Sequence, residues 1–178
     1  MADDFKTLMR ELVQDAYSAE TQLLEALPEL ADAASNPALK QAFQDHLQVT
    51  QGQVERLEQV AELLGCDAEG EDCEAMEGLL SEAEEIVDEH EEGPVRDAAL
   101  IAAAQKVEHY EIATYGTLAA MAKAAGLRDA AHLLVQTLNE EKDADERLTH
   151  LAEQQVNPAA LRGTAANDPT QTRKGSAA

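Results

Sequence analysis

Tryptophan is absent from this chain, and aromatic residues make up only 3% of it. Because 44% of the residues are nonetheless hydrophobic, the core must consist mainly of alanine, leucine and valine. Alanine and leucine favour closely packed helices, whereas β-sheets are enriched in aromatic and β-branched residues. The shortage of aromatic residues therefore predicts an all-α protein, and 178 residues suffice for one domain.

Basic residues are scarce, since 13 lysines and arginines stand against 36 acidic residues, giving a formal net charge of −23. This charge repels nucleic acid and anionic membrane surfaces, so we expect neither as a partner. Long hydrophobic runs are also missing, because no segment reaches the roughly 18 consecutive apolar residues of a membrane span. The first residues, MADDFKTLMREL, do not resemble a signal peptide, and we expect a cytoplasmic protein.

Cysteine is nearly absent, with Cys66 and Cys73 the two examples in the chain. They lie seven positions apart, without a CxxC motif and without a matched pair of histidines. Neither a redox motif nor a zinc site is therefore indicated, and we interpret both residues as ordinary thiols.

Apolar residues recur at steps of three and four along most of the chain, which is typical of amphipathic helices. At the first turn, Asn36 is a suitable N-cap, Pro37 a suitable first helical residue, and Gly65 a suitable C-cap for the helix that follows. The predicted helices span about residues 3–34, 37–64, 73–89, 95–125 and 128–155. Residues 157–178 are small, polar and aperiodic, so the sequence predicts a helical domain over 1–156 and a disordered tail over 157–178.

An internal repeat emerges when the chain is shifted on itself by 91 residues without a gap. Glu20 then falls on Glu111, and the tripeptide ERL at 55–57 meets the ERL at 146–148. We interpret the two copies as two helical hairpins, joined by a connection of about 28 residues that carries a short helix. Two short-loop hairpins with a long crossover predict a four-helix bundle, as in ferritin-like folds.

Two carboxylates lie one turn apart on the helix predicted for the third quarter of the chain, in the stretch QKVEHYEIATYGTL. Glu108 and Glu111 share one helix face, and a buried pair of like charges is costly unless a cation compensates it. Counted from the two hairpin turns, Glu111 and Glu141 lie at one level of the bundle, and so do Glu20 and Thr50. Three of these four equivalent positions carry carboxylates, so the sequence predicts that the carboxylates lie close together in the bundle.

These residues predict a metal site that holds two iron ions or, alternatively, manganese. Carboxylate oxygens and a neutral histidine suit such ions, and open coordination positions would admit oxygen or peroxide. Glu108 and Glu111 are the candidate catalytic residues, because a carboxylate that shifts its coordination would assist turnover. The candidate metal ligands are Glu20, His46, Glu108, Glu111 and Glu141, and the candidate supporting residues around them are Tyr17, Thr50, Gln53 and Tyr115.

Each of these residues also has an ordinary interpretation when it is taken alone. A glutamate in an acidic chain is more often part of a solvated helix face, and a tyrosine is more often part of the core. A single histidine on a helix, such as His46, is more often satisfied by neighbouring polar groups than a ligand, and only its level, about one turn from Thr50, makes the two interpretations about equal. The hypothesis therefore depends on the convergence of several residues at one level.

Long stretches of the chain resemble the YciE/YciF family of ferritin-like proteins over nearly residues 5–155. The matching stretches are DAYSAETQLLEALPELADAASNPALKQAFQDHLQVTQGQVERLEQV, CEAMEGLLSEAEEIV, RDAALIAAAQKVEHYEIATYGTLA and LLVQTLNEEKDADERL. The resemblance implies a four-helix bundle, a homodimer, a di-iron-type site related to that of rubrerythrins, and a link to stress responses. It also reveals a departure: the usual ExxH motifs become Thr50-x-x-Gln53 and Glu141-x-x-Ala144, so both motif histidines are missing.

The favoured function is a di-metal carboxylate protein that handles oxygen or peroxide in a stress response, with peroxidase-like oxidoreductase activity as one form of it. The alternatives are a non-catalytic iron-binding protein and a metal-free helical scaffold that binds a partner. Bound metal excludes the scaffold, and a dimer excludes a mineral-storing shell.

Overall fold

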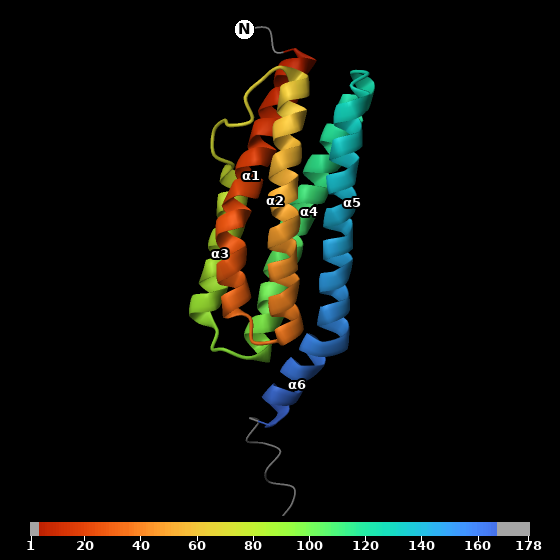
Figure 1. Ribbon diagram of the computed structural model, residues 1–178. Helices are drawn as coiled ribbons and strands as arrows, with labels where there is room; N and C mark the ends of the chain where they lie inside the picture. Colours follow the sequence, from red (N-terminus) through yellow and green to blue (C-terminus); the bar gives the residue numbers. More distant parts are fainter. Residues whose placement is uncertain (1–3, 167–178) are drawn as a thin grey trace, which may run out of the picture.

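The computed structural model describes residues 4–166, and this part of the chain contains helices and no strand. Four long helices lie side by side (Figure 1): α1 (Phe5–Ala33), α2 (Pro37–Leu64), α4 (Pro94–Ala124) and α5 (Arg128–Leu151). A shorter helix, α3 (Glu74–Glu89), packs outside them against α4 and α1. The predicted all-α class is confirmed, and within the described residues no helix combines the length and apolar character needed to cross a membrane.

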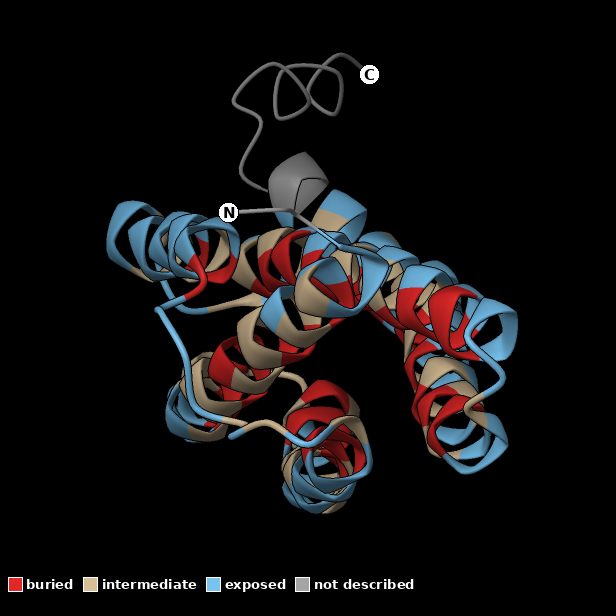
Figure 2. Ribbon diagram, turned by 90° about the horizontal axis from the view of Figure 1, so that it is seen from above, coloured by how far each residue is buried: buried red, intermediate tan, exposed pale blue. Residues whose placement is uncertain are grey.

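The four long helices form two hairpins, α1 with α2 and α4 with α5. The connection between the hairpins carries α3 back along the length of the bundle, so α2 and α4 run in the same direction (Figure 1). Buried residues lie on the helix faces that turn toward the centre of the bundle (Figure 2). A long connection with its own short helix is what the sequence predicts for residues 66–93.

The two ends of α2 use the residues that the sequence indicates. The Asn36 side chain accepts hydrogen bonds from the backbone N–H of Ala38 at 2.8 Å and of Leu39 at 3.1 Å, and Pro37 is the first helical residue. Gly65 ends α2 with a φ of 67°, a left-handed conformation that suits glycine. The predicted caps are confirmed.

Asp97 ties the two hairpins together at one end of the bundle. Its side chain is buried in the first turn of α4 and accepts hydrogen bonds from the backbone N–H of Ser35 at 2.8 Å and of Asn36 at 2.9 Å. One carboxylate thus satisfies two N–H groups of the turn between α1 and α2. The level of α4 relative to the first hairpin is fixed by this contact.

We expect Asp97→Ala to lower the free energy of unfolding by about 2–4 kcal/mol, because it leaves two N–H groups without their charged acceptor. Urea unfolding followed by circular dichroism measures the loss. Asp129→Ala is the matched control, since Asp129 also lies in a first helical turn but is exposed, and should cost less than about 1 kcal/mol. Equal losses in the two variants would contradict the role given to Asp97.

The core consists of two apolar halves with a polar layer between them. One half includes Leu23, Leu27 and Phe43, and the other includes Met9 and Leu57. Between them, at matching levels of the four long helices, lie seven buried polar residues: Glu20, Thr50, Gln53, Glu108, Glu111, Thr137 and Glu141. Buried polar groups at one level of an otherwise apolar bundle mark the candidate site.

The predicted disordered tail is wrong for its first ten residues. After α5 the chain continues through a π-helical turn, η1 (Ala152–Val156), into a further helix, α6 (Asn157–Ala166). Pro158 is tolerated because it lies in the first helical turn, alanines that follow it favour helix, and the buried Val156 anchors the preceding turn. Residues 167–178, also predicted to be disordered, lie outside the described residues.

Candidate metal centre

Four buried glutamates project into the polar layer from three helices. Glu20 comes from α1, Glu108 and Glu111 from α4, and Glu141 from α5. The exposed fractions of these glutamates are 1% for Glu20, 4% for Glu108, 2% for Glu111 and 0% for Glu141. The helices bury them because the flanking positions on the same faces are small or apolar, as the 3.6-residue period requires. A carboxylate buried to this extent needs a hydrogen-bond donor, a proton or a cation.

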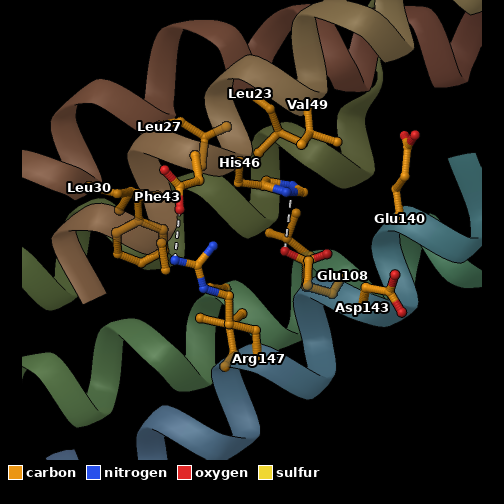
Figure 3. A pocket seen from close by; sticks show the side chains of 16 residues that line it. Leu23, Leu27, Leu30, Phe43, His46, Val49, Glu108, Glu140, Asp143 and Arg147 are labelled. Atoms are coloured by element: carbon orange, nitrogen blue, oxygen red, sulfur yellow. Dashed lines mark hydrogen bonds and ion pairs between the residues drawn. The ribbon is translucent and has the colours of Figure 1, made fainter. Parts of the chain in front are cut away.

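His46 completes the cluster from α2. One potential ligand atom from each of His46, Glu108, Glu111 and Glu141 lies within 4.8 Å of the others. The His46 Nε2 atom is 3.6 Å from Glu108 Oε1 and 3.7 Å from Glu141 Oε2, and the first of these contacts is drawn in Figure 3. These distances are too long for hydrogen bonds, but two donors that each lie about 2.1 Å from one ion are separated by up to about 4.2 Å.

Burial keeps His46 in the form that a metal ligand requires. The loss of solvent lowers the pKa of the His46 imidazole to about 4 and outweighs the nearby Glu140 carboxylate, which raises it. The imidazole is therefore neutral at pH 7 and has a free lone pair.

Glu20 lies on the other side of Glu111 and is held by Tyr115. The Tyr115 hydroxyl donates a hydrogen bond to Glu20 Oε1 inside the bundle, and both side chains are almost completely buried. The carboxyl groups of Glu20 and Glu111 are close enough to share a proton, as are those of Glu108 and Glu141. The four glutamates thus lie next to one another in the layer, with Glu20 beside Glu111 and Glu108 beside Glu141.

Many oxygens in this layer have no hydrogen-bond partner within the protein. Both oxygens of Glu111 are unsatisfied, as is one oxygen each of Glu20, Glu108 and Glu141. Buried charges without partners cost several kcal/mol each, and four carboxylates within one layer also repel one another. A set of unpaired oxygens around a neutral histidine is the donor set that iron or manganese prefers. The residues therefore fit a metal centre.

The same burial shifts the titration of the carboxyl groups in the metal-free protein. Loss of solvent raises the pKa of Glu20 and of Glu108 to about 8. Burial, reinforced by the neighbouring carboxylates, raises the pKa of Glu111 and of Glu141 well above the ordinary value. Without a cation, the layer therefore retains protons at pH 7.

A second layer of polar contacts orients Glu141. The amide Nε2 of Gln53 donates to Glu141 Oε1 and lies 3.3 Å from Glu140 Oε2. Arg56 donates through both terminal nitrogens to the Glu140 carboxylate and through Nε to Thr137 Oγ1 at 3.1 Å. These contacts link α2 to α5 beside the candidate centre. Burial raises the pKa of Glu20, and the positive charge of Arg56 offsets part of that rise.

The Arg56–Glu140 pair was not predicted from the sequence. Arg56 follows Gln53 by three residues, so the two share a helix face, and its side chain is only 12% exposed. The available signal was a single arginine on the face that also carries Thr50 and Gln53. In a sequence with 36 acidic residues, no pattern identifies Glu140 as its partner.

Not every predicted residue reaches the centre. The Tyr17 hydroxyl points toward Glu58, with its oxygen 3.5 Å from Glu58 Oε1, so Tyr17 does not support the cluster as expected. Thr50 is fully buried at the predicted level, but its hydroxyl has no hydrogen-bond partner in the described structure. The predicted supporting roles thus fall to Gln53 and Tyr115.

Comparisons with known proteins agree with the resemblance inferred from the sequence. The chain is 55% identical to protein YciF of Escherichia coli K12 over 150 residues, which cover 84% of this chain and 90% of that protein. The crystal structure of the E. coli stress protein YciF matches with a TM-score of 0.84 and 52% identity, covering 87% of this chain and 98% of that one.

Two further solved structures share this fold. YcfI of Rhodopseudomonas palustris, provisionally described as a structural protein, matches with a TM-score of 0.80 and 44% identity over 83% of this chain and 94% of that one. A protein of Xanthomonas campestris shows the same fold at 22% identity, with a TM-score of 0.74 over 90% of this chain and 99% of that one. The family model for a domain of unknown function, DUF892, matches residues 4–161, and the chain therefore belongs to the DUF892 family.

Proposed function

We propose that this chain is a ferritin-like di-metal protein, which binds two iron or manganese ions in its polar layer and handles oxygen or peroxide there during stress. The single observation that carries the proposal is the set of five unpaired carboxylate oxygens, on four buried glutamates, beside a neutral His46. The description of the E. coli relative as a stress protein supports the physiological context.

Different residues of the polar layer would hold each of the two ions. His46, Glu108, Glu111 and Glu141 would hold one ion, since one ligand atom of each lies within 4.8 Å of the others, and Glu20, which neighbours Glu111, would lie nearest the second ion. Iron or manganese bound there would supply one-electron redox chemistry toward oxygen or peroxide. Tyr115 fixes Glu20, and Gln53 fixes Glu141, so both carboxylates are oriented before an ion arrives.

A non-catalytic metal-binding protein is the second candidate, and the nitrogen-poor donor set favours it. Thr50 and Ala144 stand where related bundles carry a ligand glutamate and a ligand histidine, which leaves His46 as the one imidazole in the cluster. Imidazole nitrogens suit iron, whereas carboxylate oxygens suit manganese, so a site with one imidazole is less specialised for iron redox chemistry. Iron storage would require a closed shell of many chains, whereas we propose a homodimer. Light scattering, which measures the molecular mass in solution, distinguishes the two.

Metal titration tests the proposal directly. We expect protein purified without chelator, then made metal-free and titrated with Fe(II) under anaerobic conditions, to bind about two ions per chain. His46→Ala should lower the affinity at least about tenfold, because it removes a ligand that is already neutral and nearly buried. Calorimetry gives the stoichiometry and affinity, and oxidation of the loaded protein by peroxide tests the redox chemistry.

His132→Ala is the matched control, because His132 is an exposed histidine on α5 and should leave the affinity unchanged. Binding of less than half an equivalent of iron by the unaltered protein would rule out the di-metal proposal. Full binding with no faster oxidation than free Fe(II) would favour the non-catalytic candidate.

A further inference from the structure

An apolar pocket opens beside the candidate metal centre, between the two hairpins. Its volume is about 250 Å³, and residues of α1, α2, α4 and α5 line it. In the view of Figure 3, Leu27, Leu30 and Phe43 lie on one side of His46 and Glu108, and Glu140 and Asp143 lie on the other. The pocket thus places two candidate ligands in the wall of an otherwise largely apolar space.

The pocket arises from the altered ligand set of the centre. Ala144 lines it at the position where an ExxH motif would place a histidine after Glu141. An alanine leaves the volume of an imidazole ring empty, while His46 enters the cluster from α2 instead. Ala42 and Ala104 widen the same space from α2 and α4. The small side chains of Ala144, Ala42 and Ala104 therefore leave room for an organic molecule beside His46.

Charged residues at the rim select against anions. Arg147 of α5 reaches across to α2 and is paired with Asp45, with 2.8 Å between its Nη2 atom and Asp45 Oδ2. This pair leaves Glu140 and Asp143 as additional acidic groups on the wall, although Glu140 is itself paired with Arg56. The chain also carries a net charge of −23, so an anionic ligand would be repelled both at a distance and at the rim.

The volume limits the size of the occupant. An apolar cavity of about 150 Å³ holds benzene, so a space of about 250 Å³ accommodates a ring with a short branch. Leucine and phenylalanine side chains offer such a molecule dispersion contacts and no hydrogen bonds. A polar end group that reaches past the leucine and phenylalanine side chains meets His46 and Glu108, while Glu140 and Asp143 lie on the far side of these two residues.

We propose that this pocket binds a neutral organic molecule of about ten non-hydrogen atoms, with its single hydroxyl or hydroperoxyl end directed at His46 and Glu108. The proposal rests on the proposed function and deepens it, because it names the class of molecule that reaches the metal centre: an organic hydroperoxide or the corresponding alcohol. The apolar part of the molecule lies against Leu27, Leu30 and Phe43.

The probe for the test is 2-phenylpropan-2-ol, a neutral alcohol of ten non-hydrogen atoms. Its binding is followed through the methyl NMR signals of Leu27, Leu30 and Val107, in the metal-free protein and in the protein loaded with diamagnetic zinc. We expect saturable shifts in both forms. Ala144→Phe should weaken binding at least tenfold by filling the pocket, and Val49→Trp provides a second blocking variant if the first does not fold.

Ala26→Phe is the matched control, since Ala26 is also a partly exposed helix alanine but faces the grooves beside α3. It should bind the alcohol as the unaltered protein does. The anion 2-phenylpropanoate should bind at least tenfold more weakly, and equal affinity would overturn the selection for neutral molecules.

The two proposals fail in different ways. Absence of saturable methyl shifts in the unaltered protein, or undiminished binding by both blocking variants, overturns the pocket proposal while leaving metal titration untouched. Failure to bind iron overturns the metal centre, whereas alcohol binding by the metal-free protein still supports a ligand pocket at this position.

Discussion

Removing bound metal at pH 8 is expected to lower the melting temperature by about 8–16 °C. An ion present at 1,000 times its dissociation constant stabilises the folded state by about 4 kcal/mol, and each kcal/mol shifts the melting temperature of a chain of this size by about 2–4 °C. Chelation also leaves four buried carboxyl groups without a cation. Differential scanning calorimetry with and without chelator measures the shift.

The same experiment at pH 5 should give a shift of less than about 3 °C. In the metal-free protein, burial raises the pKa of Glu20 and of Glu108 to about 8, against about 4.5 for an exposed glutamate. Their protonated forms therefore favour folding below pH 4.5, and this contribution is lost as the pH rises to 8. Protons also compete with the metal for the same oxygens at low pH, so the metal-bound form loses its advantage.

A metal-free scaffold predicts a different pattern. Chelator would then leave the melting temperature unchanged at both pH values. A shift that is equally large at pH 5 and pH 8 would indicate that the bound ion does not sit among the buried glutamates. The pH dependence thus locates the ion as well as detecting it.

The helices and their ends could be predicted because local sequence determines them. Asn36, Pro37 and Gly65 act through local preferences, and the structure confirms Asn36 and Gly65 as caps and Pro37 as the first helical residue of α2. The level of Glu20 and Glu111 followed from the repeat, since equal spacing from equivalent turns fixes equal height in a bundle of straight helices. Both glutamates are buried in the polar layer.

Features that depend on packing between helices could not be predicted in the same way. Tyr17 shares a helix with Glu20, but small differences in rotation about the helix axis decide whether a side chain faces the centre or Glu58 on α2. The Arg56–Glu140 pair spans two helices, and the composition offers many acidic partners. The pocket at Ala144 is a space left by a small residue, and its size depends on every neighbouring side chain.

Glu111→Gln is expected to raise the stability of the metal-free protein by about 1–4 kcal/mol at pH 8, while lowering its affinity for iron. Glu111 is the glutamate with no hydrogen-bond donor for either oxygen. Burial raises the pKa of Glu111 well above its ordinary value, so folding at pH 8 must keep this carboxyl protonated at a cost in free energy. A neutral amide removes that cost and can donate to Glu20 in place of the shared proton. Urea unfolding in the presence of chelator measures the gain, and calorimetric iron titration measures the loss.

Glu25→Gln is the control for this variant, because Glu25 is exposed on α1 and its replacement should change stability by less than about 0.5 kcal/mol. Glu140→Gln should instead lower the stability of the metal-free protein, since it leaves the nearly buried Arg56 without its carboxylate partner. A destabilising effect of Glu111→Gln in metal-free protein would show that this carboxylate has a compensating partner other than a metal. A gain in stability together with weaker iron binding is the result expected of a residue whose burial is tolerated because it binds an ion.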